Sequence, residues 1–126
     1  MSVPQASSPT TRRRVLIVED EILIGMLLED MLSDLGYDVI ATASRVEEAT
    51  KLAREIEIDA AILDVNLNGQ EVYPVAEILA ERGIPFVFAT GYGERGLPNA
   101  HQQRPTLQKP FQQGMLEREL AGLFKD

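Results

Sequence analysis

The run Val15-Leu16-Ile17-Val18-Glu19-Asp20 decides the fold class of this chain of 126 residues. Four consecutive apolar residues are typical of a short strand that is buried on both faces, as in a parallel sheet. The acidic pair ends the run. Residues 21–35 then carry apolar side chains at helical spacing, with Gly36 as a natural stop. The stretch therefore predicts a buried strand followed by a helix.

The same alternation repeats along the rest of the chain. Apolar runs predict further strands at residues 37–41, 60–63, 86–89 and, more weakly, 106–107. Helices are predicted from a capping box at Ser44-Arg45-Val46-Glu47 to about residue 55, at residues 73–82 and at residues 111–124. Pro105 suits an edge position for the last strand. Five strands alternating with helices predict an α/β fold, a doubly wound five-stranded parallel sheet with helices on both faces.

Composition indicates an ordinary globular domain, with 44% hydrophobic and 25% charged residues. The length allows one domain with a real core, and we expect a flexible tail at residues 1–11 and a folded domain at residues 12–126. Cysteine is absent and His101 is the single histidine, which excludes thiolate chemistry and multi-histidine metal sites. We expect Met26 and Met31 to fill the core.

Charge and hydropathy exclude two kinds of partner. The net charge of −8 argues against nucleic-acid binding, and Arg12, Arg13 and Arg14 are interpreted as a solvated flank before the first strand. No apolar run approaches the length of about 20 residues that a membrane span needs. Because the start of the chain also lacks a secretory signal pattern, we expect a cytoplasmic protein with no membrane contact.

Polar side chains follow four of the predicted strands. Glu19 and Asp20 follow the first strand, Asp64 the third, Thr90 the fourth and Lys109 the fifth. The carboxyl ends of parallel strands meet at one edge of such a sheet, where ligands bind. Clustered carboxylates repel one another and favour a hard cation such as Mg²⁺. An ammonium and a hydroxyl beside that cation leave a place for a phosphoryl group, which an aspartate can accept as a nucleophile.

These residues stand in motifs that resemble the receiver domains of two-component response regulators, a CheY-like superfamily. The resemblance covers about residues 14–124 and implies a flavodoxin-like fold with strand order 2-1-3-4-5. It also implies a cis bond between Lys109 and Pro110. The four matching motifs are Val15-Leu16-Ile17-Val18-Glu19-Asp20, Ala61-Ile62-Leu63-Asp64, Phe88-Ala89-Thr90-Gly91 and Lys109-Pro110-Phe111.

The resemblance implies a role for each residue of the site. Asp64 would be the phosphoacceptor, Thr90 the hydroxyl that follows the phosphoryl group, and Lys109 the ammonium that pairs with it. The Mg²⁺ ligands would be Glu19, Asp20, Asp64 and the backbone carbonyl of Asn66. The chain would take its phosphoryl group from a histidine kinase or histidine phosphotransferase and signal through a downstream protein partner. Its only catalysis would be its own phosphorylation and dephosphorylation.

The chain departs from the common receiver pattern at the expected switch. The aromatic residue expected three positions before Lys109 is Thr106, and the run Phe88-Ala89-Thr90-Gly91-Tyr92 resembles the FATGUY subgroup, many of whose members are single-domain. Tyr92 is the aromatic residue on the loop after Thr90, so we hypothesise that it takes over part of the switching. The loop after Asp64 also differs, reading Val65-Asn66-Leu67-Asn68-Gly69.

Glycine and proline weaken the segment that follows Thr90. In a helix interior, glycine costs about 1 kcal/mol and proline about 3 kcal/mol relative to alanine. The fourth helix of the receiver pattern is therefore predicted to be short or mobile here. The residues that predict this are Gly91, Gly93, Gly96 and Pro98.

Other functions remain open beside the phosphoryl acceptor. A receiver fold can serve as a phosphorylation-independent adaptor with a vestigial acidic pocket, and the discriminating observation is whether an aspartyl phosphate forms. A phosphohydrolase of the haloacid-dehalogenase type also uses an aspartate nucleophile, but it needs a second aspartate at the position that Asn66 occupies. A flavin-binding protein is disfavoured because no Ser/Thr-rich phosphate loop follows the first strand.

Overall fold

The computed structural model describes residues 12–67, 69–90 and 106–124, which form a five-stranded parallel sheet between two helical layers. The strand order is β3-β2-β4-β7-β8, which is 2-1-3-4-5 when the strands of this sheet are counted along the chain. The predicted fold class and strand order are thereby confirmed. The five strands are β2 (Arg14–Val18), β3 (Asp38–Ala43), β4 (Ala60–Asp64), β7 (Phe86–Thr90) and β8 (Thr106–Gln108).

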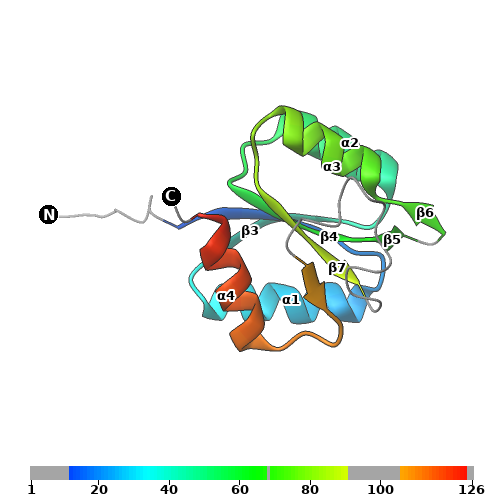
Figure 1. Cartoon of the computed structure of the whole chain (residues 1–126). Helices are drawn as coiled ribbons and strands as arrows, with labels where there is room; N and C mark the ends of the chain where they lie inside the picture. Colours follow the sequence, from blue (N-terminus) through cyan, green and yellow to red (C-terminus); the bar gives the residue numbers. More distant parts are fainter. Residues whose placement is uncertain (1–11, 68, 91–105, 125–126) are drawn as a thin grey trace, which may run out of the picture.

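In the part of the chain that the structure describes, two helices cover each face of the sheet. Figure 1 shows α2 and α3 on one side of the sheet and α1 and α4 on the other. The helices are α1 (Ile22–Asp34), α2 (Val46–Glu55), α3 (Tyr73–Glu81) and α4 (Gln113–Leu123). Because both faces are covered, the central strands are apolar without alternation, as Val15–Val18 of β2 illustrate: all four side chains are buried.

Successive residues of β2 point into two separate cores. Val15 and Ile17 pack with Leu28 of α1 and the helix α4, whereas Leu16 and Val18 pack with the helices α2 and α3. The second core also receives Phe88 of β7, whose ring lies edge-on to that of Phe86, with centroids 5.4 Å apart. Side chains therefore pack against both faces of the sheet.

The two edges of the sheet differ. Edge strand β8 is short and has Pro105 directly before it in the sequence, as predicted. The other edge strand, β3, has a register shift opposite Val15 and Leu16, which leaves Ile40 unmatched in the pairing and 45% exposed. A bulge on an edge strand interrupts the row of free backbone groups that another chain could pair with.

Some local predictions were wrong in detail. Helix α2 begins at Val46 with Arg45 as its N-cap, and no side chain caps it. The backbone N–H of Ser44 instead donates to Glu48 Oε1 at 3.1 Å, so the carboxylate of the expected capping box is one residue further along. Met26 does not fill the core, since it is 55% exposed. Met31 does pack against the core.

A small antiparallel hairpin between β4 and α3 was not predicted. Its strands are β5 (Asn66–Leu67) and β6 (Gln70–Glu71), and Leu67 is its buried anchor. The tail at residues 1–11, Tyr92 and the glycine-rich segment after Thr90 lie outside the described residues. Among the helices that are described, none has the length and apolar character that crossing a membrane requires.

Candidate functional site

The site lies at the carboxyl edge of the sheet, where β2, β4 and β7 end side by side. Glu19 and Asp20 directly follow β2, whereas Asp64 and Thr90 are the last residues of β4 and β7. The Glu19 backbone N–H donates to the Ala43 carbonyl at the end of β3, at 2.9 Å, which holds the turn after β2 in place. The predicted convergence of these segments at one edge is therefore present.

Three carboxylates meet one lysine at this edge. Glu19, Asp20 and Asp64 each offer an oxygen within 4.8 Å of the other two. Lys109 Nζ lies 3.2 Å from Glu19 Oε1 and 3.2 Å from Asp64 Oδ2. Since this cluster holds three carboxylates and one ammonium, which pairs with two of them, it carries an excess of negative charge that a further cation would offset.

Glu19 is the most deeply placed of these carboxylates, with a side chain that is only 1% exposed. Its Oε2 accepts the backbone N–H of Glu21 at 3.1 Å, while Oε1 makes an ion pair with Lys109. Burial, together with the hydrogen bond and charge of neighbouring Asp64, raises the pKa of Glu19 to about 7. A carboxylate in this position gains from any cation that approaches Oε1.

Lys109 is held by both its backbone and its side chain. Its backbone N–H donates to the Thr90 carbonyl at 3.1 Å, and the peptide bond to Pro110 is cis, as the resemblance implied. Partial burial acts to lower the pKa of Lys109, but the nearby charges of Asp64 and Glu19 outweigh it and raise that pKa. The side chain is therefore a permanent cation at physiological pH.

The structure describes the other residues predicted for the site, Thr90, Asn66 and Tyr92, in less detail. Thr90 is buried beside the site at the end of β7, and Asn66 begins the β5–β6 hairpin two residues after Asp64. Thr106, which stands where an aromatic switch was expected, is half-buried and pairs with Phe88 as the first residue of β8. The switch candidate Tyr92 lies outside the part of the chain that the structure describes.

The donor set suits a hard divalent cation. Carboxylate oxygens from Glu19, Asp20 and Asp64 are the ligand type that Mg²⁺ prefers, and Mg²⁺ keeps part of its water shell rather than needing a full protein cage. The deeply buried Glu19 Oε1, which has no hydrogen bond among the described residues, is a donor atom that a cation would satisfy. The acidic cluster therefore fits the predicted magnesium site.

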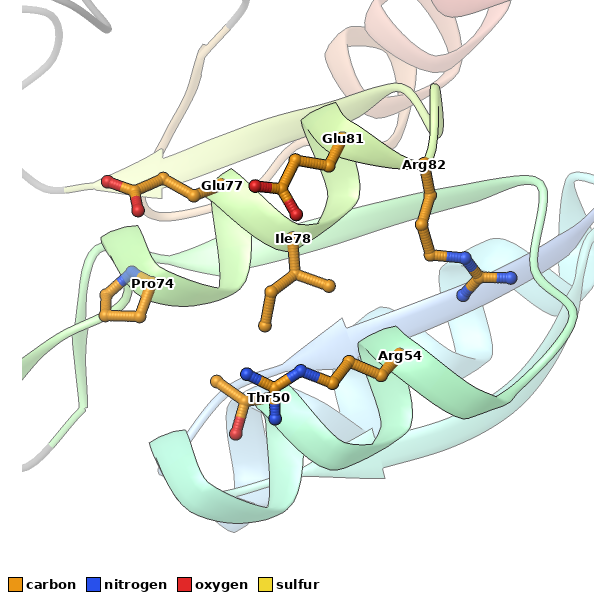
Figure 2. A pocket seen from close by; sticks show the side chains of 7 residues that line it. All are labelled: Thr50, Arg54, Pro74, Glu77, Ile78, Glu81 and Arg82. Carbon is orange, nitrogen blue, oxygen red and sulfur yellow. The ribbon is translucent and has the colours of Figure 1, made fainter.

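A separate groove of about 640 Å³ lies between α2 and α3, and none of the site residues lines it (Figure 2). Ile78 lies between Arg54 of α2 and the α3 pair Glu77 and Glu81. Arg82, at the end of α3, donates hydrogen bonds to the Ala53 and Ile56 carbonyls at the end of α2. The arginine thus ties the two helices together on the face away from α1.

Residues 15–121 match the response regulator receiver domain family. The match covers most of the chain, so this protein belongs to that family and is a receiver domain of two-component signalling. Among the curated relatives, the transcriptional regulatory protein PdtaR of Mycobacterium tuberculosis is 38% identical over 86 residues. Those residues are 68% of this chain and 42% of the relative, so the match spans less than half of that protein's length.

Solved receiver structures have the same fold. SdrG of Sphingomonas melonis Fr1 is 46% identical, with a TM-score of 0.81 and coverage of 90% of this chain and 98% of SdrG. Its BeF3-activated conformation, reported for Pseudomonas melonis Fr1, matches at 48% identity with a TM-score of 0.78 over 89% of this chain and 96% of that one. The receiver domain of a sensor histidine kinase from Pseudomonas aeruginosa, with magnesium coordinated in its active-site cleft, is 25% identical, with a TM-score of 0.77 over 90% of this chain and 98% of that one.

Proposed function

We propose that this receiver accepts a phosphoryl group on Asp64 from a histidine kinase or histidine phosphotransferase and passes the signal on through protein contacts. The observation that carries the proposal is the cluster at the sheet edge, in which three carboxylates lie within 4.8 Å of one another and Lys109 makes ion pairs with two of them. Such an excess of carboxylates is unfavourable for folding alone and suits a site that binds a cation and then an anionic group.

The proposed transfer is a displacement at phosphorus. An Asp64 carboxylate oxygen forms the new P–O bond while the P–N bond of the donor phosphohistidine breaks, and the imidazole nitrogen leaves with the electron pair. Bound Mg²⁺ would neutralise charge on the phosphoryl oxygens. Glu19, Asp20, Asp64 and the Asn66 carbonyl are its proposed ligands.

Lys109 and Thr90 complete the proposed machinery. Lys109 holds Asp64 through an ion pair of 3.2 Å, and its ammonium is the group that would pair with a phosphoryl oxygen. The hydroxyl of Thr90, at the end of β7, would donate to another such oxygen. The hydrogen bond from the Lys109 backbone N–H to the Thr90 carbonyl links the ends of β8 and β7. A displacement of Thr90 would therefore also displace the Lys109 backbone.

The proposed output is a changed protein contact. We propose no enzymatic activity beyond formation and hydrolysis of the protein's own aspartyl phosphate, and no nucleic-acid contact. The BeF3-activated form of SdrG supports the idea that a receiver of this kind adopts a distinct activated state. Tyr92 stays the residue proposed to take over part of the switching, and Tyr92→Ala should uncouple phosphorylation from partner binding.

Intact-mass spectrometry after incubation with acetyl phosphate or phosphoramidate tests the proposal. One added phosphoryl group that requires Mg²⁺ and is absent in Asp64→Asn is the expected result. Asp59→Asn is the matched control. Asp59 directly precedes β4, at the end of the strand away from Asp64, and forms an ion pair with Arg14. If neither donor labels the protein and beryllofluoride causes no change, the phosphorylation-independent adaptor takes the place of this function.

A further inference from the structure

A short hairpin joins the end of β4 to the start of α3. Its two strands pair Asn66 with Glu71. Leu67 pairs with Gln70, so the turn between the strands has two residues. Figure 1 shows this hairpin at the carboxyl edge of the sheet, where Asp64 ends β4. The hairpin therefore begins two residues after a carboxylate of the site.

Leu67 anchors the hairpin in the core. Its side chain is only 1% exposed, whereas residues 69–71 are exposed, and it belongs to the same buried cluster as Val72 and Phe88. The Val72 backbone N–H donates to the Val65 carbonyl at 3.2 Å, which closes the base of the hairpin. Because a two-stranded hairpin is marginal by itself, the contact of Leu67 with the core is what fixes it to the sheet.

The pairing directs the Asn66 carbonyl away from β6. In an antiparallel ladder, pairs that exchange hydrogen bonds alternate with pairs whose backbone groups point away from each other. Since the Val72 N–H donates to Val65, the next pair, Asn66 with Glu71, is of the second kind. The carbonyl of Asn66 thus points out of the hairpin, and carbonyl oxygens are among the hard ligands that suit Mg²⁺.

Gly69 gives the turn its shape. Its φ is +85°, a value that L side chains rarely adopt, and an added Cβ there would meet no atom within 4 Å. Gly83 has a φ of +73° with the same open space, and it lies between α3 and β7, at the amino ends of the strands. The two glycines therefore meet the same backbone demand, one beside the site and one far from it.

We propose that the β5–β6 hairpin holds the Asn66 carbonyl in place for Mg²⁺ before the cation binds, with Leu67 and Gly69 as its positioning residues. The inference rests on the proposed function, in which this carbonyl is a ligand of the cation. Mg²⁺ demands near-ideal octahedral geometry, so a ligand contributes fully only when its position is fixed. Residues that orient a ligand without touching the metal control affinity for this reason.

The test compares matched pairs of variants in the whole chain. Gly69→Ala is matched by Gly83→Ala, which introduces the same backbone strain away from the site. Leu67→Ala is matched by Leu79→Ala, because Leu79 of α3 is fully buried in the same core. Titration calorimetry measures Mg²⁺ affinity, and urea unfolding in EDTA measures stability. Gly69→Asn is the conservative variant, since asparagine tolerates positive φ.

Gly69→Ala and Leu67→Ala should each weaken Mg²⁺ binding about tenfold, while Gly83→Ala and Leu79→Ala should change it less than about twofold. The members of each pair should lower the urea midpoint by similar amounts, and Gly69→Asn should restore most of the Mg²⁺ affinity. In the wild type, the Val72 amide should exchange slowly with solvent in EDTA, and Mg²⁺ should change its protection little, because the hairpin is already formed.

Three outcomes would overturn the positioning role: equal weakening of Mg²⁺ binding by the Gly83→Ala and Leu79→Ala controls, wild-type affinity in both hairpin variants, or a Val72 amide that becomes protected only with Mg²⁺. If Leu67→Ala does not fold, the glycine pair and the amide exchange decide. A wild type without Mg²⁺ affinity also overturns it. Failure of the proposed function is distinguishable, since acetyl phosphate and beryllofluoride would then leave unchanged a wild type that still binds Mg²⁺.

Discussion

At the amino-terminal edge of the sheet each arginine has its own partner, whereas at the carboxyl edge one lysine pairs with two of three clustered carboxylates. Arg12 pairs with Asp38 at 2.9 Å, Arg13 lies 4.1 Å over the Phe124 ring, and Arg14 pairs with Asp59. The Phe124 ring in turn stacks on Tyr37, with centroids 6.3 Å apart. The three arginines are therefore more than the solvated flank that their sequence suggested.

The two ends of the strands differ in how completely their charged side chains are paired. At the amino edge, Arg12 and Arg14 each pair with one carboxylate, and Arg13 lies over an aromatic ring. At the carboxyl edge, Lys109 contacts both Glu19 and Asp64, and Asp20 adds a further negative charge. Substitutions at the two edges should therefore have effects that differ in size and, in one case, in sign.

Lys109→Met should give the largest change. It leaves the buried Glu19 and Asp64 carboxylates without their cation, which should lower the free energy of unfolding by about 2–3 kcal/mol. The figure is below that for a fully buried pair because a fifth of the lysine side chain is exposed. Urea unfolding in EDTA measures the loss, and millimolar Mg²⁺ should restore part of it. Lys51→Met is the control: Lys51 is exposed on α2, so the substitution should leave the free energy of unfolding unchanged.

Glu19→Gln should act in the opposite direction. Removing one of three crowded carboxylates should raise the free energy of unfolding in EDTA at pH 8 by about 1–3 kcal/mol, the usual cost of an incompletely paired buried polar group. The same change should weaken Mg²⁺ binding about tenfold or more, measured by titration calorimetry. A Glu19→Gln protein that is less stable than the wild type in EDTA would contradict the comparison between the two edges.

Asp59→Asn tests the amino edge through pH. Partial burial disfavours the Asp59 charge, but the Arg14 backbone N–H, at 2.7 Å, and the Arg14 guanidinium outweigh it and lower the pKa of that carboxyl. A carboxyl with a lowered folded pKa stabilises above its unfolded value of 3.8 and loses that contribution as the pH falls through the folded pKa.

The substitution Asp59→Asn should therefore cost about 0.5–1 kcal/mol at pH 7, after allowance for solvent screening of this partly exposed pair. It should also flatten the decline of stability below pH 4, measured by thermal unfolding across a pH series. A variant that retains the wild-type decline would show that other carboxylates dominate acid unfolding.

Arg12→Ala should have the smallest effect. The pair of Arg12 with Asp38 is half-exposed, so its loss should cost less than about 0.5 kcal/mol and vanish at high salt. Urea unfolding at low and at high ionic strength measures it. A loss as large as that of Lys109→Met would mean that the amino edge, too, depends on a desolvated charge.

The fold was predictable because its signals are local. The apolar run Val15–Val18 predicts a strand that is covered on both faces. The polar residues Asp64 and Thr90 mark the ends of their strands independently of the segments that pack against them. Parallel topology then brings these ends to one edge. Predictions that depended on neighbours were less accurate, since helix α2 begins one residue later than the capping box implied.

The exposed apolar residues Ile22, Leu23, Met26 and Leu27 of α1 show why helical spacing alone was insufficient to predict which residues are buried. Leu27 belongs to the apolar pattern and Met26 was expected in the core, yet both are exposed. Apolar residues surround the first turns of α1 on almost every side, and the pattern does not say which of them the sheet and α4 will cover. The unusual density of apolar residues from Ile22 to Leu28 was the available signal.

Local sequence patterns were enough to predict the order of elements, the class of fold and the residues that gather at the carboxyl edge, because hydrophobic periodicity and parallel topology are local signals. The three-dimensional structure was needed to show that Lys109 contacts Glu19 as well as Asp64, that Glu19 is almost fully buried, and that one side of α1 stays uncovered. These features depend on distances between segments far apart in the chain, which no local pattern encodes.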